Sequence, residues 1–393
     1  MVDQSAPKRL RIGFLGARGV VGTYSGIETY YEEVGSRLVE RGHEVTVYCR
    51  NYFTPPLETY RGLKVRRLPC IQGKHIETMS HSLLGTLDCL LRPFDIMQYH
   101  AIGSAPLAFI PRLFGKKTVV SVHGLDWQRA KWGFVARTYL QSGEWASARC
   151  PTATCVVSGG LQEHYEAAHG RRPFMIPNAV VPPTRVEVDR LREHGLGSGD
   201  FFLFAGRLSP EKGVHTLLEA LKPLADSGVT QGKKLVIAGG TSFTEGYIDE
   251  LRALAWDDVI FLGRVDREYM HELLSHCHAY ILPSVMEGLS VGLLEALSYG
   301  LCIITTSIPE NLEVVGDVAL TFPVGDVEAL RGCLETSLTQ PDVVEDHRRR
   351  TAERAAGWPD WDGVAELTES LYFQILGLTE ADPEDPTRLR RAS

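Results

Sequence analysis

The chain has 393 residues, of which 44% are hydrophobic and 23% are charged, and its formal net charge is −8. This composition is typical of a soluble globular protein with enough residues for two ordinary domains. No apolar run approaches the roughly 18 residues of a membrane span. The first residues, MVDQSAPKRLRIGFLG, lack the apolar core and the cleavage site of a signal peptide.

Charge is unevenly distributed along the chain. Residues 1–180 contain 22 Lys and Arg against 14 Asp and Glu, whereas residues 181–393 contain 19 against 35, so the two parts carry +8 and −16. A basic half joined to an acidic half predicts two domains with different partners. The basic half favours an anionic partner, either a phosphorylated molecule or a phospholipid surface. Chance surface composition is the alternative explanation.

The eight cysteines include no CxxC pair, and most lie in apolar contexts such as "CIITT". We expect them to be reduced core residues of a cytoplasmic protein. The triplet "HCH" at 276–278 raises the question of a metal site. Because nothing nearby supplies the remaining ligands at a usual spacing, no metal site is predicted there.

The first half of the chain alternates apolar strands with helical segments. "RLRIGFLGARG" is a strand entering a glycine-rich turn, "IETYYEEVGSRLVERG" is helical and ends at Gly42, and "HEVTVYCR" is a second strand. "DIMQYHAIGSAPLAF", "KTVVSVHGLDW" and "TATCVVSGGLQEHY" continue this alternation. Continuous apolar strands between helices indicate a parallel sheet covered on both faces. The pattern pauses at residues 176–189, "IPNAVVPPTRVEVD", which are predicted to be a linker.

The second half restarts the same pattern with "FFLFAGRLSPEKG", "VHTLLEALKPLAD" and "KKLVIAGG", followed by further strands. The predicted fold class is therefore α/β, with two Rossmann-like, doubly wound parallel-sheet domains facing a cleft and ligands at the carboxyl ends of the strands. We place the domains at residues 1–180 and 181–360. A helix at 361–378 is expected to pack back on the first domain, and residues 379–393 are expected to form a mobile tail.

The stretch "MEGLSVGLLEAL" places Glu287 and Glu295 eight positions apart in apolar surroundings. Ser290 is predicted to cap a helix from about Val291 to Tyr299, with Gly300 as its stop. Glu287 then precedes the helix and Glu295 lies more than one turn inside it. The backbone N–H groups between them suit a phosphate. Since carboxylates repel phosphate, the two glutamates should hold hydroxyl-rich parts of the same ligand, a sugar and a ribose.

A second element supports a diphosphate ligand. "AGRLSPEKG" places Arg207 and Lys212 in the loop after the first strand of the second domain. Two cations at the carboxyl end of this strand can reach a diphosphate, Arg as a planar fork and Lys as a point charge. An ordinary solvated loop is the alternative, and it is weakened by the two glutamates nearby.

With these motifs the chain resembles the retaining glycosyltransferases of the GT4 group, which have the GT-B fold. The resemblance covers residues 10–375 and rests chiefly on Glu287…Glu295 and on the GR-x4-KG loop. Further segments match landmarks of that family: "VIAGG", "FLGRV", "YILPSVMEG", "ALSYGLCIITT" and "IPN". "TYSGIETYYEEV" and "HGLDWQRAKW" are similar to the rhamnosyltransferase-like branch, which builds bacterial surface polysaccharides. The resemblance implies a hexosyl- or deoxyhexosyltransferase that uses a nucleotide-diphosphate-sugar donor.

The resemblance also implies roles for individual residues. In the second domain, two cations neutralise the diphosphate, backbone groups bind phosphate and sugar, Glu287 contacts the transferred sugar, and a strand end lies near the base. In the first domain, the loop from Gly16 to Gly26 closes over the diphosphate and acceptor, and His123 faces the reacting sugar. The implied donor-binding residues are Gly16, Arg207, Lys212, Gly263, Val265, Gly288, Leu289, Ser290 and Glu295, and the acceptor-side candidates are Gly26, Glu28, Trp127 and Arg129.

His123 ends an apolar strand and precedes a glycine, so it should lie at a carboxyl end. A lone histidine is more often structural, but position and resemblance favour hydrogen bonding to the sugar over general-base catalysis. Retention by front-face attack would need no protein nucleophile. Neither a cofactor nor a divalent metal is expected, because the two cations and the helix dipole would stabilise the leaving diphosphate.

The acceptor is expected to be a saccharide or a lipid-linked saccharide, with peripheral contact of the basic domain at the inner membrane face and no nucleic-acid partner. Two other functions remain open. One is a non-catalytic nucleotide-sugar-binding subunit. The other is an NAD-dependent oxidoreductase, suggested by glycines at 13, 16, 19 and 22, but the acidic residue expected after the second strand is absent from "VTVYCR".

Overall fold

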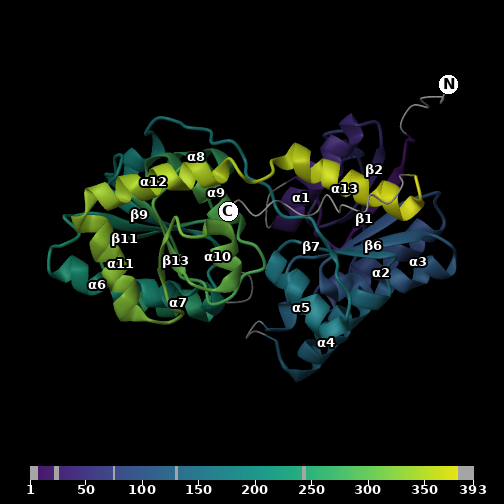
Figure 1. Cartoon of the computed structure of the whole chain (residues 1–393), viewed down its shortest axis with the longest axis horizontal. Coiled ribbons are helices and arrows are strands. Elements are labelled where there is room, and N and C mark those ends of the chain that lie inside the picture. Colours follow the sequence, from purple (N-terminus) through teal and green to yellow (C-terminus); the bar gives the residue numbers. More distant parts are fainter. Residues whose placement is uncertain (1–7, 22–25, 74–75, 129–131, 241–244, 379–393) are drawn as a thin grey trace. The chain divides into compact units, whose positions relative to one another are not determined.

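The computed structural model describes residues 8–21, 26–73, 76–128, 132–240 and 245–378. The chain forms two compact units (Figure 1). The first contains the residues up to Asn178 together with those from Pro359 onward, and the second spans Ala179–Trp358. The chain crosses between the units inside the proline-rich segment 176–189 and again just before the last helix. The tail that we expected at 379–393 lies outside the described residues.

The first unit is built on a sheet of eight strands in the order β3-β4-β2-β1-β5-β6-β7-β8. Every neighbouring pair is parallel except β3 and β4. The central strands are almost wholly buried, as their continuous apolar runs predict. The strands are β1 Arg11–Leu15, β2 Glu44–Arg50, β3 Thr59–Tyr60, β4 Leu63–Leu68, β5 Ile96–His100, β6 Lys117–Val122, β7 Ala153–Val156 and β8 Phe174–Met175.

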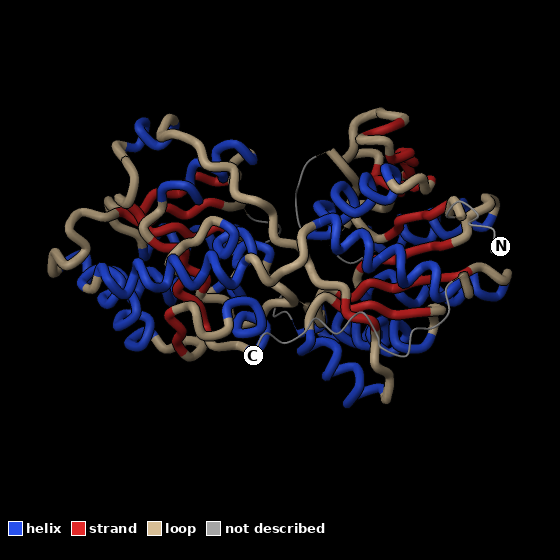
Figure 2. Tube along the Cα trace, turned by 45° about the horizontal axis from the view of Figure 1, so that its top comes forward, coloured by secondary structure: helices blue, strands red, loops and turns tan. Residues whose placement is uncertain are grey.

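Helices cover both faces of this sheet (Figure 2). They are α1 Gly26–Glu40, α2 Glu77–Leu90, α3 Phe109–Leu113, α4 Phe134–Arg149, α5 Gly159–His169 and α13 Trp361–Leu376. None of the helices in the described part of the chain has the length and apolar character needed to cross a bilayer.

The second unit contains a six-stranded parallel sheet in the order β11-β10-β9-β12-β13-β14. The order reverses between β9 and β12, which is where ligands bind in open α/β sheets. The strands are β9 Phe201–Ala205, β10 Lys234–Ala238, β11 Val259–Gly263, β12 Ala279–Leu282, β13 Ile303–Thr306 and β14 Leu320–Phe322. The helices are α6 Val214–Asp226, α7 Glu245–Leu254, α8 Arg267–His276, α9 Val291–Ser298, α10 Pro309–Val315, α11 Val327–Thr339 and α12 Pro341–Ala355.

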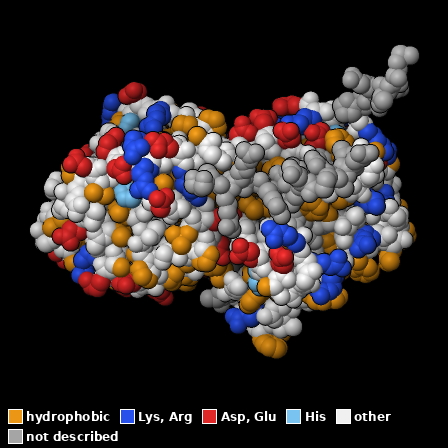
Figure 3. Space-filling view, in the orientation of Figure 1, with side chains coloured by type: hydrophobic (Ala, Val, Ile, Leu, Met, Phe, Trp, Pro, Cys, Tyr) orange, Lys and Arg blue, Asp and Glu red, His pale blue; other side chains and the backbone are white. Residues whose placement is uncertain are grey.

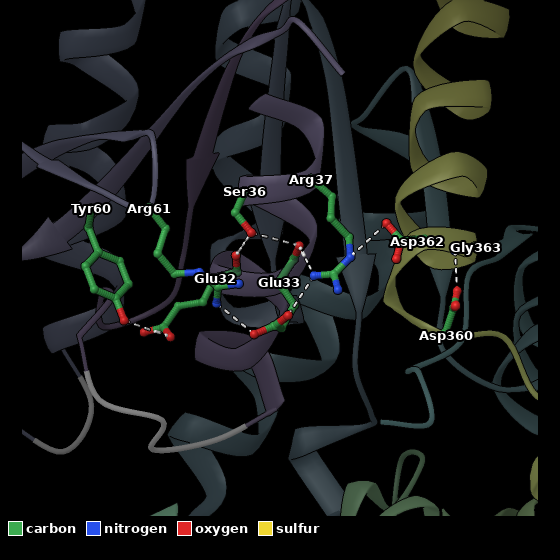
Figure 4. Close-up of polar contacts among 9 residues, drawn as sticks. All are labelled: Glu32, Glu33, Ser36, Arg37, Tyr60, Arg61, Asp360, Asp362 and Gly363. Atoms are coloured by element: carbon green, nitrogen blue, oxygen red, sulfur yellow. Dashed lines mark hydrogen bonds and ion pairs between the residues drawn. The ribbon is translucent and has the colours of Figure 1, made fainter. Parts of the chain in front are cut away.

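The last helix, α13, lies beside α1 in the first unit. Asp360 caps it by accepting a bond from the Gly363 N–H at 2.8 Å. Arg37 of α1 bridges Glu33 on its own helix, at 2.7 Å, and Asp362 of α13, at 3.1 Å (Figure 4). The pair with Asp362, whose side chain is 65% exposed, contributes little. It helps to fix the register of the two helices rather than supplying most of the stability.

The stability of this contact comes from its buried side. The Thr368 hydroxyl bonds the Tyr30 hydroxyl of α1 at 2.9 Å, and the Tyr372 hydroxyl donates to Gln98 of β5. Both tyrosine hydroxyls are deeply buried, and burial raises their pKa far above the usual range. The apolar side chains of α13 complete the core of the first unit; buried among them are Trp361, Val364, Ala365 and Leu371.

Removing residues 359–393 should therefore unfold the first unit. Burying Trp361, Val364, Leu371 and Tyr372 contributes on the order of 6–12 kcal/mol at about 1.5–3 kcal/mol each, as large as the whole stability of a typical domain. Denaturant unfolding followed by circular dichroism should show that the transition of the first unit is lost in this truncated chain. A chain ending at Leu378 should unfold like the full chain. If the chain without residues 359–393 unfolded at the same denaturant midpoint as the full chain, this role of α13 in the first unit would be wrong.

Candidate functional site

The loop after β9 is pressed against the loop after β12. Gly213 has φ +67°, and a Cβ there would lie 2.1 Å from the carbonyl oxygen of Pro283, so this position requires glycine. The N–H of Val285 donates to the Glu211 carbonyl at 3.0 Å. These backbone contacts hold residues 207–212 and 283–290 side by side, as both follow central strands at the same edge of the sheet.

Lys212 and Glu287 form an ion pair within this contact. The Lys212 ammonium lies 2.5 Å from Glu287 Oε1, and the two side chains are only 14% and 10% exposed. We predicted that Lys212 binds a diphosphate and Glu287 binds a sugar, and the structure brings the two together. A largely buried pair is costly to break by removing one partner. A phosphate that reaches Lys212 therefore has to share the ammonium with Glu287.

The predicted helix after Glu287 is confirmed. It is α9, and the Ser290 hydroxyl caps it by accepting from the Leu293 N–H at 3.3 Å. Gly292 lets its first turn approach the sheet, because a Cβ there would lie 2.3 Å from the Tyr280 hydroxyl. That hydroxyl donates to the Ala205 carbonyl at 3.0 Å. The positive end of α9, with Gly288 and Leu289 before it, thus lies beside the end of β9.

Glu295 lies on α9, as predicted, and is half-buried. Burial raises the pKa of its carboxyl to about 7, and the charge of Arg267 opposes the rise. A carboxyl with this pKa changes charge near neutral pH. After losing its proton it only accepts hydrogen bonds, and its bonds from hydroxyl groups are then stronger.

Gly263 ends β11, the outermost strand on this side of the sheet, and Val265 follows it. Gly263 has φ +67°, so the chain turns there as the strand ends. β11 lies three strands from β12, which corresponds to about 14 Å at roughly 4.8 Å per strand. This interval is suited to an elongated ligand such as a nucleotide diphosphate, with Arg207 after the intervening strand β9.

Glu310 is a neighbour of Glu287 that sequence reasoning missed. It is the second residue of α10, which follows β13 after two residues. Burial raises the pKa of its carboxyl, and the charges of Glu287 and Glu313 raise it further. The neighbouring Asn311 is fully buried and bonds both hydroxyls of Thr305 and Thr306, at 2.9 and 3.0 Å. The sequence "PEN" at 309–311, which follows an apolar strand, could have identified Glu310 as a residue at the same edge of the sheet.

In the first unit, His123 follows β6 and contacts His100 at the end of the neighbouring strand β5. His100 Nδ1 lies 3.0 Å from His123 Nε2, and the two rings stack with centroids 5.3 Å apart. Burial lowers the pKa of both, of His123 to about 4 and of His100 well below its usual value, to which the charge of His123 also contributes. Both imidazoles are therefore neutral at pH 7. One donates and the other accepts, so the tautomer of His100 determines that of His123.

His100 is completely buried and was also missed by sequence reasoning, although "DIMQYH" ends a strand just as "KTVVSVH" does. Its backbone is crowded by Gly16. This glycine has φ +108°, and a Cβ there would lie 2.4 Å from the His100 carbonyl oxygen. Gly16 is thus needed for close packing of the two strand ends.

Two glutamates of α1 bind the backbone of the described part of the glycine-rich loop. The Arg18 N–H donates to Glu28 Oε1 at 3.1 Å, and the Val21 N–H donates to Glu32 Oε1 at 2.8 Å. Glu28, one of our acceptor-side candidates, is buried and supports the loop. Gly26 starts α1. Residues 22–25, where the predicted loop continues, lie outside the described residues.

Trp127 lies in the loop after His123. Its indole N–H donates to Glu144 Oε2 at 2.6 Å, while the other carboxylate oxygen lies 2.8 Å from His164 Nε2 and 2.7 Å from His169 Nε2. Glu144 of α4 and the two histidines of α5, His164 and His169, lie close enough together to hold a metal ion. Arg129, the remaining acceptor-side candidate, lies outside the described residues.

The "HCH" triplet does not form a ligand set. His276 Nε2 contacts the Val186 carbonyl at 2.7 Å, and His278 Nε2 contacts the Ser337 carbonyl at 2.9 Å. Cys277 is buried between them. The three side chains therefore have separate structural contacts.

If His123 faces the reacting sugar, as the resemblance implies, replacing it with Ala should lower kcat about 100-fold and leave donor affinity nearly unchanged. His100→Phe should give a smaller kcat loss by freeing the tautomer of His123. At saturating donor, wild-type kcat should fall only as the pH approaches 4, where the His123 pKa lies. A kcat that halved near pH 6.5 would contradict the neutral pair, and His194→Ala, in the second unit, is the control.

Two protein families match this chain. Residues 24–182 match the family described as Glycosyltransferase Family 4, and residues 191–358 match Glycosyl transferases group 1. The chain belongs to the GT-B glycosyltransferases of the GT4 group. The two matches of this glycosyltransferase coincide with its two structural units, and the fold class that we predicted is confirmed.

Known relatives match this glycosyltransferase in part. Glycogen synthase of Mycobacterium tuberculosis is 30% identical over 44% of the chain and 42% of that protein. D-rhamnosyltransferase WbpZ of Pseudomonas aeruginosa is 30% identical over 39% of the chain and 40% of that protein. The chain thus spans less than half of these relatives. HepE of Anabaena, solved in complex with UDP-glucose, is 17% identical with a TM-score of 0.75, over 92% of this chain and 99% of that one.

Proposed function

We propose that the protein is a retaining glycosyltransferase that moves a hexosyl or deoxyhexosyl group from a nucleotide-diphosphate-sugar to a hydroxyl acceptor. The observation that carries this proposal is the meeting of the Lys212–Glu287 pair with the start of α9 at the switch point of the second sheet. A cation, a helix N-terminus and a carboxylate there match a ligand that joins a phosphate to a sugar. The family and the UDP-glucose complex of HepE support this donor class.

The donor would be held along the carboxyl edge of the second sheet. Arg207 and Lys212 neutralise the diphosphate, and the backbone before α9 binds its oxygens. Glu287 accepts hydrogen bonds from the transferred sugar and Glu295 from the ribose. The base lies toward Gly263 and Val265.

The reaction breaks the bond between the anomeric carbon and the diphosphate oxygen and forms a bond from the same carbon to the acceptor oxygen. Attack on the face that the diphosphate leaves retains the anomeric configuration, and the leaving phosphate takes the acceptor proton. The neutral His123 hydrogen-bonds the sugar and does not act as the base. The two cations and the dipole of α9 stabilise the leaving charge, so the chemistry requires no divalent metal.

The first unit would bind the acceptor, a saccharide or lipid-linked saccharide of bacterial surface polysaccharide assembly, at the inner membrane face. Residues 1–180 carry +8 and residues 359–393 of the same unit carry −5, so the unit has a net charge of +3, which supports contact with an anionic surface. Exposed apolar side chains add to it, among them Leu91, Leu113 and Phe114. The match to a D-rhamnosyltransferase supports the rhamnosyltransferase-like branch.

The test is to incubate the protein with nucleotide-diphosphate-sugars in the absence of acceptor and to follow the released sugar by NMR before it mutarotates. We expect slow hydrolysis that yields the anomer present in the donor. Release of the opposite anomer would overturn retention. Tight binding of a donor without hydrolysis, or without transfer to any saccharide, would favour the nucleotide-sugar-binding subunit.

A further inference from the structure

A cavity of about 330 Å³ lies in the first unit, next to His169 of the cluster around Glu144, which contacts its lining residues Arg149 and Tyr165. Arg112 belongs to α3, which precedes β6, Arg149 ends α4 before β7, and two arginines precede β8. Because β6, β7 and β8 are parallel, these residues gather at the amino edge of the sheet, opposite to His123. The cavity is lined by Arg112, Arg149, Arg171, Arg172, Ala148, Pro151, Thr152, Ala153, Thr154, Tyr165, Pro173 and Phe174.

Four arginines line this cavity, and none of the described lining residues is Asp or Glu. Arg112 donates to the carbonyl oxygens of Cys150 and Pro151, at 2.8 and 3.1 Å, so carbonyls rather than a carboxylate hold it. Arg149 lies over the Trp145 ring, 5.2 Å from its centroid. Two carboxylates lie near the set: the exposed Glu166 pairs with Arg172 at 2.7 Å, and Glu144 contacts His169 at 2.7 Å, whose other ring nitrogen lies 3.4 Å from Arg149.

Like charges in a shared cavity repel, and an anion between them relieves the repulsion. Guanidinium groups are also the side chains that match phosphate oxygens two at a time. Arg112 and Arg149 are already oriented by a carbonyl and an aromatic ring, so binding would cost them little side-chain entropy. We propose that this arginine cavity binds a phosphate group.

The surroundings of the cavity indicate the source of the phosphate. Leu113 and Phe114 follow Arg112 directly and are 74% and 67% exposed, and Leu91, at the same edge, is 89% exposed. The Lys116 ammonium donates to the Arg92 carbonyl at 2.7 Å and adds a basic group between these apolar side chains. Figure 3 shows Lys and Arg side chains interspersed with hydrophobic ones over the part of this unit that carries α2 and α3 in Figure 1.

Apolar side chains beside a phosphate site suit the headgroup of an anionic phospholipid, with Leu113 and Phe114 entering the acyl boundary. A soluble phosphorylated molecule would use the arginines alone. The inference rests on the membrane contact in the proposed function and specifies the surface that makes it. The cavity lies at the edge opposite to His123, so its occupant would leave the reacting edge open.

The experiment measures sedimentation with vesicles of phosphatidylcholine alone or with phosphatidylglycerol, with no nucleotide sugar present. We expect the protein to bind the anionic vesicles and the double variant R171Q/R172Q to bind about 25-fold more weakly, at a factor of about five for each basic residue near the surface. The control is R349Q/R350Q, two adjacent arginines on α12 with the same loss of charge. Equal weakening by both variants would overturn the site, because it would reflect net charge alone.

Two further arms identify the source. Phe114→Ser should weaken vesicle binding without altering stabilisation of the protein by inorganic phosphate in thermal unfolding. If Phe114→Ser has no effect on vesicles but R171Q/R172Q abolishes stabilisation by phosphate, the site takes a soluble phosphate. Absence of both vesicle and phosphate binding in the folded wild-type protein would overturn the proposal. Since no donor is present, these results are independent of whether sugar transfer occurs.

Discussion

Replacing Arg207 or Lys212 with Ala should lower kcat/KM for the donor about 30- to 1000-fold, a loss of about 2–4 kcal/mol of transition-state stabilisation. The two side chains are expected to neutralise charge that grows on the leaving diphosphate. Lys212 is also largely buried and already held by Glu287, so little reorganisation accompanies the reaction. Steady-state kinetics of nucleotide release measures the effect.

The matched controls are Lys222→Ala and Arg252→Ala. Lys222 pairs with Asp226 on the solvent side of α6, and Arg252 lies exposed in the last turn of α7. Both remove one positive charge from the same unit and should change the rate less than twofold. If the folded double variant Arg207→Ala with Lys212→Ala turned over like the wild type, the diphosphate would have to bind elsewhere.

Glu287→Gln and Glu295→Gln should differ in kind. Glu287→Gln should lower kcat strongly, because this carboxylate is expected to hold the reacting sugar and also positions Lys212. Glu295→Gln should mainly weaken donor binding, since the ribose lies away from the bond that breaks. Comparing kcat with the dissociation constant of the donor separates the two effects, and Glu250→Gln on the exposed face of α7 serves as the control.

The pKa of Glu295 gives this prediction a pH dependence. Its carboxyl has a pKa of about 7, and the ionised form accepts bonds from two ribose hydroxyls more strongly than the protonated form does. Donor binding therefore releases a proton, so donor affinity should increase as the pH rises toward 7 and level off above it. Glu295→Gln should abolish this dependence. The assignment fails if both glutamate variants change only donor affinity, or if Glu295→Gln retains the wild-type pH profile.

Local patterns in the sequence predicted the strands and the start of α9. "AYILPS" and "CIITT" read as buried strands because parallel strands are apolar on both faces. Ser290 and Gly300 marked both ends of the helix, since capping depends on residues within one turn. The linker at 176–189 was evident from its prolines. These features depend on residues that are close together in the chain, so they can be predicted from the sequence.

Contacts between segments that are distant in the chain could not be predicted from local patterns. The Lys212–Glu287 pair joins residues 75 positions apart, and the contact of His100 with His123 depends on β5 and β6 being neighbours. The arginine cavity draws on α3, α4 and the loop before β8, where each arginine alone resembles an ordinary surface charge. Strand order and side-chain direction decide such contacts, and a one-dimensional pattern contains neither.

The proposed function depends most on binding of a nucleotide-diphosphate-sugar by the second unit through Lys212 and Glu287. Its most direct test is release of nucleotide diphosphate from a panel of nucleotide sugars, with wild-type protein beside Lys212→Ala, Glu287→Gln and the double variant. We predict release from at least one donor, a large loss in each single variant, and a double-variant loss smaller than the product of the two, because the residues act as a pair. Equal release by all four proteins, or release from no nucleotide sugar in the presence of saccharide acceptors, would contradict the account.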